Sequence, residues 1–413
     1  MNALRVGLFL AIRYVRRSNV WATLLIVFIM LLTFLNVVVV RGILIGLPIG
    51  AVEVYNEQYS GDVLVESFPE RSYIENSTYV SAVLESTEEV QAFSPRYISG
   101  GLVEANYKQS RKDSELADNV SAPITGIDPA MEDAVTGLAE QVVEGDYLDG
   151  DDLESVMIGS QLIDRYNLGP LGDESLEDVY PGTKIRISIN GNTREFTVKG
   201  IVKTKIGDVS RRVYMLDQSA RKMMGRFDYN VDEVAVRAKS GVSPENLKAS
   251  LYASGLDEYA LVETSRESQG QFTQDIEDTF EILGVIIGLI GLIVASITVF
   301  IVIFINAVSR QKQIGILKGI GVSSLSIELS YVFLSIFYAA IGVVLGTVVL
   351  YGVIMPYFLE NPIDFPFSDG ILVAPYLDTA VRSGLIVFAT IVAGYIPASI
   401  IVKKNTMNAI LGR

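Results

Sequence analysis

Two residue types are missing from this 413-residue chain, which contains no cysteine and no histidine. Without cysteine there are no disulfides, thiolate nucleophiles or thiolate metal ligands, and without histidine there are no imidazole bases and none of the commonest zinc ligands. Ser-His-Asp and Cys-His enzymes are therefore excluded, which leaves carboxylate, lysine, tyrosine or Ser-Lys chemistry. The sequence also lacks a G-x-x-x-x-G-K-[ST] motif, so the chain binds no nucleotide through a P-loop.

Half of the residues are apolar although the formal charge is −15, so charged and apolar residues must occupy different parts of the chain. Four apolar runs are each long enough for a membrane-spanning helix, which needs ~20 residues. Arginines precede the first run as in a signal peptide, but the run is too long and no small-residue cleavage site follows it. We therefore expect one retained helix near the N-terminus and three more near the other end. The expected spans are residues 20–40, 282–305, 329–352 and 384–402.

The charges beside these spans predict an orientation. Lysine and arginine concentrate in short cytoplasmic segments, which here are an amphipathic N-terminal segment (1–19), a loop (306–327) and a tail (403–413). Residues 353–383 then form an external loop. All but six of the 48 acidic residues lie between residues 42 and 280. We therefore expect a multi-pass protein of the cytoplasmic membrane with both termini in the cytoplasm and one large acidic domain outside, at residues 46–279.

The external domain has the patterns of an α+β fold, which we expect to form two lobes. Residues 184–189 alternate polar and apolar before Asn190-Gly191, which predicts a β-hairpin. Further strands are expected at 62–66, 90–103, 231–238 and 259–264. Ser243 before Pro244 predicts the start of a helix that extends through Leu251. Helices are also expected at 161–168 and at 271–281, the latter continuing into the second span.

The acidic cluster at residues 146–154 lacks the spacing of a calcium loop and is interpreted as a solvated loop. No metal site is expected. The triplets at Asn76 and Asn119 permit glycosylation where the machinery exists.

The cytoplasmic segments are too short to fold as an output domain, so the chain either works through a cytoplasmic partner or acts purely outside. Residues 310–321 are amphipathic, with Ile314 and Leu317 three apart on one face and cationic residues around them. This pattern fits a helix that lies on anionic lipid or one that docks into the groove of a partner.

The loop sequence SRQKQIGILKGIGVS, residues 309–323, resembles the signature of FtsX-type ABC permeases, commonly R-x-x-E-I-G-I-L-R-A-I-G-A-S. Gln313 replaces the frequent Glu, and Lys318-Gly319 replaces Arg-Ala. The external domain is similar to the MacB-type periplasmic core in the segments TGIDP (125–129), EGDYL (144–148), VMIGS (156–160), PGTKI (181–185) and FTVKGI (196–201). GYIPA (394–398) is similar to the end of the family's last span, whereas the tail NTMNAIL (405–411) lacks the usual Asp-Pro.

The resemblance to FtsX/MacB/LolC-type permeases implies a half-transporter that pairs with a second copy or a sister permease. It also implies two copies of a cytoplasmic ABC ATPase that bind ATP and Mg, with no cofactor in this chain. Membrane lipid is a further partner, and no nucleic acid is expected. Glycines four apart would let helices approach closely; these are Gly284, Gly288, Gly342 and Gly346. The residues expected to couple to the ATPase are Arg310, Gln311, Lys312, Gln313, Ile314, Gly315, Ile316, Leu317 and Lys318.

Three functions are compatible with the sequence. The leading hypothesis is a permease that moves lipoproteins, lipids, peptides or drugs by transmitting motion to its external domain. The alternatives are an FtsX-like regulator of an external cell-wall hydrolase, although such proteins usually carry a smaller external domain, and an external binding protein anchored in the membrane without an ATPase.

Overall fold

The structure is a computed structural model that describes residues 3–108, 117–167, 175–361, 363–365, 368–370 and 372–403. It divides into two compact units. The first, a helical unit, comprises Met1–Ile49, Gln274–Phe365 and Asp369–Arg413. The second, an α/β unit, comprises Gly50–Thr273 and Pro366–Ser368. The tail segment 405–411 lies outside the described residues.

Four helical segments of the described chain are long and apolar enough to cross a membrane, which confirms the expected arrangement of one plus three. They span Val20–Ser60, Asp278–Ser309, Ser324–Glu360 and Tyr376–Val402. All four extend beyond the apolar runs into sequence that contains charged residues, among them Arg41, Asp278, Glu328 and Asp378. Their component helices are α2 (Val20–Leu35), η1 (Asn36–Val40), α3 (Arg41–Tyr55), η2 (Asn56–Ser60), α10 (Gly270–Ser309), α12 (Ser324–Val349), η7 (Leu350–Ile354), α13 (Met355–Glu360) and α14 (Tyr376–Val402).

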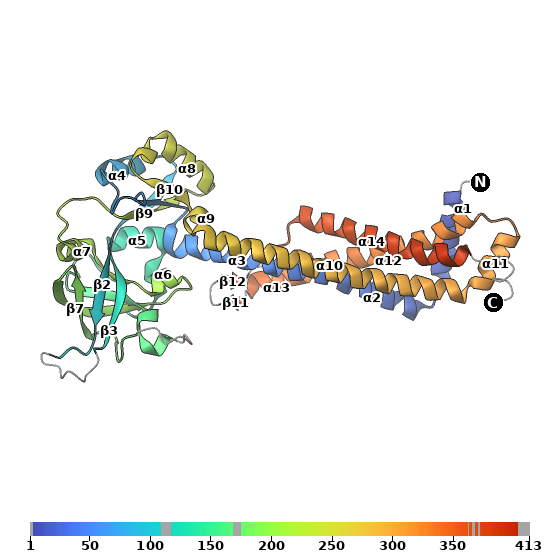
Figure 1. Cartoon of the computed structure of the whole chain (residues 1–413), viewed down its shortest axis with the longest axis horizontal. Helices are drawn as coiled ribbons and strands as arrows, with labels where there is room; N and C mark the ends of the chain where they lie inside the picture. The colour runs from blue at the N-terminus through green and yellow to red at the C-terminus, as the bar shows by residue number, and fades with distance from the viewer. Residues whose placement is uncertain are drawn as a thin grey trace. The chain divides into compact units, whose positions relative to one another are not determined.

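Two short helices lie at one end of the long ones. They are α1 (Ala3–Arg16) and α11 (Gln311–Gly319). Figure 1 shows α1 turned across the direction of α12 and α14. A buried apolar cluster joins these elements, with Tyr14 of α1, Ile314 of α11 and Tyr331 of α12 among its members. The expected N-terminal segment and loop are therefore parts of one folded assembly with the spans.

Two of the expected packing glycines lie at a close helix contact. A Cβ on Gly342 of α12 would lie 2.4 Å from the Cβ of Met30 in α2, and one on Gly346 would lie 2.3 Å from the Cδ1 of Phe34. Such distances are far below van der Waals contact, so only glycine fits. A Cβ on Gly284 would meet the Arg41 side chain at 3.2 Å, whereas one on Gly288 would have no heavy atom within 4 Å.

The α/β unit is built on one ten-stranded mixed sheet with the order β10-β1-β9-β2-β3-β8-β5-β7-β4, and β6 pairs with β2 and β7. The expected hairpin is confirmed as β6 and β7. The strands are β1 (Val63–Glu66), β2 (Val90–Glu104), β3 (Asn119–Ile127), β4 (Val142–Gly145), β5 (Ser155–Gly159), β6 (Lys184–Ile189), β7 (Asn192–Val202), β8 (Val213–Leu216), β9 (Glu233–Ala238) and β10 (Leu261–Thr264). A separate pair consists of β11 (Ile363–Phe365) and β12 (Ser368–Gly370).

The long strand β2 connects two parts of this sheet. Its first half, through Arg96, pairs with β9, and its second half, from Tyr97, pairs with β3. The two expected lobes are thus parts of one continuous sheet. Alternate residues of β1 enter different cores, with Val63 and Val65 in one and Leu64 in the other.

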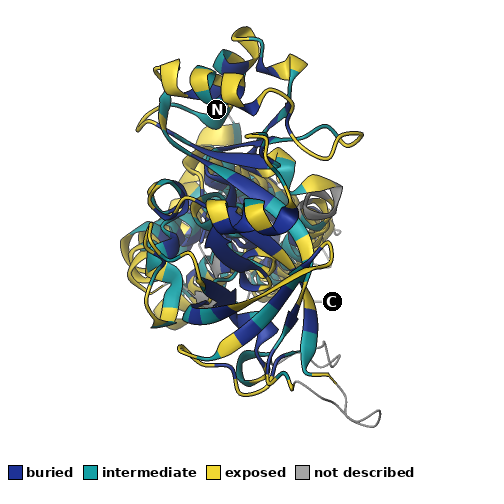
Figure 2. Ribbon diagram, turned by 90° about the vertical axis from the view of Figure 1, so that its left-hand side faces the viewer, coloured by how far each residue is buried: buried dark blue, intermediate teal, exposed yellow. Residues whose placement is uncertain are grey.

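Helices cover both parts of the sheet. Figure 1 shows α4 (Ser77–Ser86) and α8 (Pro244–Ala253) beside β9 and β10. Figure 2 shows their outer faces exposed and the strands beneath largely buried. Ser243 caps α8 as expected, because its side chain accepts a hydrogen bond from the Asn246 amide. The other helices are α5 (Pro129–Thr136), α6 (Gly207–Ser210), α7 (Asp217–Met224), α9 (Ser265–Ser268), η3 (Leu138–Gln141) and η6 (Leu256–Glu258).

One expected element of this unit is wrong. The helix expected at 161–168 is replaced by two single turns of 3₁₀ helix, η4 (Ser160–Leu162) and η5 (Asp164–Tyr166). Between them Ile163 is extended and forms a bridge with Leu176. Pairing with a distant segment therefore overrides the local helical pattern, and Leu168 lies outside the described residues.

The glycine contacts generate a matched prediction. We expect Gly342→Leu to destabilise the helical unit by about 1–3 kcal/mol, because the new side chain overpacks the contact with α2. Gly288→Leu should not destabilise it, because the new side chain meets no neighbouring atom and leucine has a helix propensity about 1 kcal/mol better than that of glycine. Thermal unfolding of the full chain in detergent measures both, and equal midpoints for the two variants would contradict the contact.

Candidate coupling site

The helix α11 occupies the loop that the sequence singles out. It begins after Arg310 and ends before Gly321, whose φ of +92° reverses the chain toward α12. Glycine adopts this left-handed conformation without steric cost. Ser323 then caps α12 by accepting a hydrogen bond from the Ser326 amide. The turn at Gly321 and the cap at Ser323 thus define where α11 ends and α12 begins.

One face of α11 is packed against the rest of its unit. Ile314 is only 1% exposed and belongs to the cluster that includes Tyr14 and Tyr331. Gly315 is also buried, and Leu317 packs against the same cluster. The apolar pair that the sequence pattern highlighted, Ile314 and Leu317, therefore points inward.

Two of the expected cationic residues hold α11 in place. The Arg310 guanidinium lies 4.6 Å from the ring centroid of Tyr14, within range of a cation–π interaction. The Lys318 ammonium donates a hydrogen bond of 2.8 Å to the carbonyl of Val402, at the end of α14. These contacts connect α11 to α1 and α14. Gln311 is half-buried beside them.

The opposite face of α11 is exposed. We call Lys312, Gln313, Ile316 and Ile320 the outward face. Ile316 is 57% exposed and Ile320 is 73% exposed, four residues apart on one side of the helix. Lys312 and Gln313 are exposed as well. The outward face thus combines two large apolar side chains with one cation on an element whose other face is anchored.

A second feature, which the sequence patterns did not predict, lies in the α/β unit at the end of the helical segment Val20–Ser60. We call this segment the first long helix. Tyr59, in η2, donates its hydroxyl to both carboxylate oxygens of Glu233, at 3.0 and 2.9 Å. The same hydroxyl accepts a hydrogen bond of 2.6 Å from Arg212. The backbone carbonyl of Tyr59 accepts another, of 2.7 Å, from Arg96. These hydrogen bonds fix the end of the first long helix to β2, to β9 and to the turn just before β8.

Arg96 is the centre of this network and is only 2% exposed. Its guanidinium donates to the Glu132 carboxylate at 2.6 and 2.9 Å and to Glu233 at 2.8 Å. Ser94, two residues earlier on the same strand face, also donates to Glu132, at 2.7 Å. The sequence signal that could have revealed the network is the alternation of Ser94 and Arg96, which places two polar side chains on one face of β2. We call Tyr59, Arg96, Glu132, Arg212 and Glu233 the helix anchor.

The nearby arginines keep Glu233 ionised. Burial by itself raises the pKa of Glu233, but the nearby Arg212 and Arg96 outweigh that effect, so its pKa lies below the usual range. For Glu66, at the end of β1, Arg212 compensates only in part. Burial and then the charges of Glu233 and Glu263 raise the pKa of Glu66 from 4.5 to about 7.

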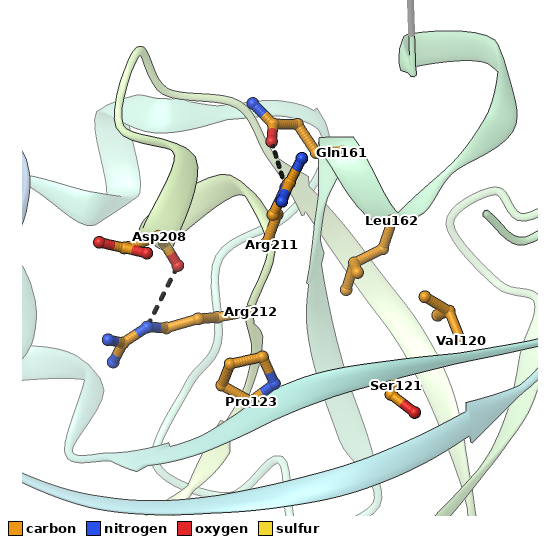
Figure 3. A pocket seen from close by; sticks show the side chains of 8 residues that line it. All are labelled: Val120, Ser121, Pro123, Gln161, Leu162, Asp208, Arg211 and Arg212. Atoms are coloured by element: carbon orange, nitrogen blue, oxygen red, sulfur yellow. Dashed lines mark hydrogen bonds between the residues drawn. The ribbon is translucent and has the colours of Figure 1, made fainter. Parts of the chain in front are cut away.

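A polar pocket of about 340 Å³ lies next to the anchor, between β3, η4 and the turn before β8. Figure 3 shows Arg211 and Gln161 pointing toward one another, and their hydrogen bond is 2.9 Å long. Arg212 points elsewhere and donates to the carbonyl of Asp208 at 3.1 Å. This pocket therefore borders the arginine that holds Tyr59.

The acidic loop has an internal counter-charge. Lys199 of β7 bridges Asp149 and Asp152, at 2.8 and 2.5 Å. In the described parts of the chain, no group of three or more Asp or Glu side chains is arranged to hold a metal ion.

Four spans, a packed loop helix and one large sheet-based domain outside the membrane define a membrane permease of the ABC transporter class. The profile of the MacB-like periplasmic core domain matches residues 35–253, just over half of the chain, and that of the FtsX-like permease C-terminal region matches residues 285–406. The chain belongs to the FtsX/MacB-type ABC transporter permeases. Permeases of this family are transporter components that work with a cytoplasmic ABC ATPase.

Solved structures resemble the α/β unit at low sequence identity. The periplasmic region of MacB from Actinobacillus actinomycetemcomitans is 16% identical, with a TM-score of 0.36, over 51% of this chain and 92% of that one. The extracellular domain of the noncanonic ABC-type transporter YknZ from Gram-positive bacteria is 13% identical, with a TM-score of 0.32, over 49% and 97%. No curated protein matches the chain.

The helix anchor generates a stability prediction. Arg96→Met leaves the carboxylates of Glu132 and Glu233 without their main partner, and loss of one member of a buried ion pair costs about 3–5 kcal/mol. Arg71→Met is the control, because Arg71 and Glu75 form an exposed pair worth less than about 1 kcal/mol. Hydrogen exchange of β2 and β9 in the full chain should accelerate in Arg96→Met only. Unchanged protection would refute the role of Arg96.

The raised pKa of Glu66 generates a pH prediction. A carboxyl whose folded pKa exceeds its unfolded value favours folding at low pH and loses that contribution as pH rises from about 4.5 to 7. Glu66→Gln should therefore become more stable than the parent across this window, by about 1–2 kcal/mol after solvent screening, and the gain should level off above pH 7. Exposed Glu70→Gln is the control. A gain that does not depend on pH would contradict the assignment.

Proposed function

We propose that this chain is the permease subunit of a MacB/LolC-like ABC transporter, and that the outward face of α11 docks onto the ATPase. The observation that carries the proposal is the division of α11 into an anchored face and an exposed face. Ile316 and Ile320 supply apolar contact and Lys312 supplies charge, while Arg310 and Lys318 bind the helix to α1 and α14. A helix held in this way transmits a force on its outward face to the membrane-spanning helices.

The chain connections of the α/β unit support transmission of motion outward. The first long helix ends at Ser60 and leads directly into β1, and β10 leads through α9 into α10. β1 and β10 pair with each other, with Val63 opposite Thr264. The helix anchor and the capping box formed by Thr264 and Glu267 fix both connections. A displacement of the first long helix relative to α10 would therefore act on β1 and β10, which are neighbours at the edge of the sheet.

The span in α10 supports pairing with a second permease copy or a sister permease. Of the four spans in the described chain, it has the smallest share of residues buried by the rest of the structure. An apolar groove of about 560 Å³ lies between α10 and α14, with Phe300 and Phe388 among its lining residues. In the proposed assembly two ATPase copies bind on the cytoplasmic side, where both termini also lie, and the α/β unit moves a lipoprotein, lipid, peptide or drug.

The outward face generates the decisive test. Ile316→Asp places a charge on the proposed contact, so we expect the ATPase subunit to be lost on purification in mild detergent and the ATPase activity of the complex to fall at least tenfold. Leu377→Asp is the matched control, because Leu377 is equally apolar and 80% exposed but lies at the opposite end of α14 from Val402. Full activity of Ile316→Asp would show that α11 does not couple to an ATPase.

A further inference from the structure

An apolar groove lies on one side of α1, where this helix crosses α12. It has a volume of about 330 Å³ and is lined by eight residues, all from α1 and α12. Its α1 wall includes Leu8, Ile12 and Val15, and its α12 wall includes Phe333 and Phe337. Arg16 is the one charged side chain among the eight, and it lies at the C-terminal end of the α1 wall.

The groove exists because α1 contacts α12 through another of its faces. Gly7, Ala11 and Tyr14 are the buried residues of α1. A Cβ on Gly7 would lie 3.0 Å from the Cβ of Leu329 and 3.1 Å from the carbonyl of Ser326, so the two helices meet closely at this point. Leu8 and Ile12 project from the neighbouring side of α1 and remain exposed. The wall residues of α12 lie one to two turns further along it than Leu329.

The composition of the groove matches one kind of ligand. A purely apolar groove would fit any lipid chain or helix. This groove also contains the permanently cationic guanidinium of Arg16, at the C-terminal end of its α1 wall. From Leu8 to Arg16 the helix rises roughly 12 Å, so a chain in the groove and a phosphate at Arg16 suit a single amphiphile. Arginine is well matched to phosphate because its donors form a planar fork.

We propose that this groove binds one anionic phospholipid, with an acyl chain between α1 and α12 and the headgroup phosphate at Arg16. The lipid belongs to the leaflet at the α11 end of the spans, because Tyr14 of α1 contacts Arg310 beside α11. The bound lipid fills the space between the crossing helices and thereby holds α1 against the helix α12. This inference needs only the location of the chain in a membrane and does not depend on coupling through α11.

Photo-crosslinking tests the proposal on the full chain in nanodiscs. The probes are phosphatidylglycerol and phosphatidylcholine that carry the same photoreactive acyl chain, and mass spectrometry maps the crosslinked peptides. We expect phosphatidylglycerol to label α1 around Leu8–Ile12 and α12 around Phe333–Phe337. A basic residue in contact with an anionic lipid contributes about fivefold in affinity. Arg16→Gln removes the one basic side chain that lines the groove and should reduce this labelling about fivefold.

Two further variants make the test specific. Arg13→Gln makes the same charge change at an exposed residue that does not line the groove, and it should leave labelling unchanged. Ile12→Trp fills the groove at an exposed position without altering charge and should abolish labelling of α12. Equal labelling by both lipids, or equal effects of Arg16→Gln and Arg13→Gln, would each overturn the proposal.

Discussion

A buried guanidinium is the constraint on which the α/β unit depends. Arg96 lies inside a sheet, where an unpaired charge would be very costly, so its surroundings must supply carboxylates and carbonyls at hydrogen-bonding distance. Glu132 of α5, Glu233 of β9 and the Tyr59 carbonyl of η2 do so. These hydrogen bonds bring together β2, its neighbour β9, the covering helix α5 and η2, the end of the first long helix. The polar network thus specifies where that helix joins the sheet, which apolar packing alone would leave less defined.

The helical unit uses the opposite principle, since its contacts depend on the absence of side chains. Gly342 and Gly346 let α2 approach α12, and Gly7 lets α1 approach α12 nearer the start of that helix. Because lipid tails are as apolar as leucine, helices in a membrane gain little from burying apolar surface and more from close packing. Where close packing ends, space remains, and the groove beside Arg16 is one such space. The same assembly holds the inner face of α11 and leaves Ile316 and Ile320 uncovered.

Local patterns predicted elements well where the local cause is dominant. The length of the four apolar runs, the Asn190-Gly191 turn and the Ser243-Pro244 cap each act within a few residues, and the structure contains the corresponding spans, hairpin and helix. The helix expected at 161–168 failed because Ile163 pairs with Leu176. For α11, the pattern identified the amphipathic segment, but the apolar pair Ile314 and Leu317 packs inward. Periodicity shows that one face is apolar without showing which neighbour covers it.

The sequence by itself determined the class of protein, because span length, charge asymmetry and the family motifs are all written in consecutive residues. It also determined what chemistry is excluded, because cysteine and histidine are absent. Only the tertiary structure decided which residues act together. Tyr59, Arg96 and Glu233 are separated by up to 174 positions, and Arg16 faces Phe333 and Phe337 only after α1 has folded onto α12. Contacts of this kind arise from packing between distant segments, and no local pattern of charge or hydropathy records them.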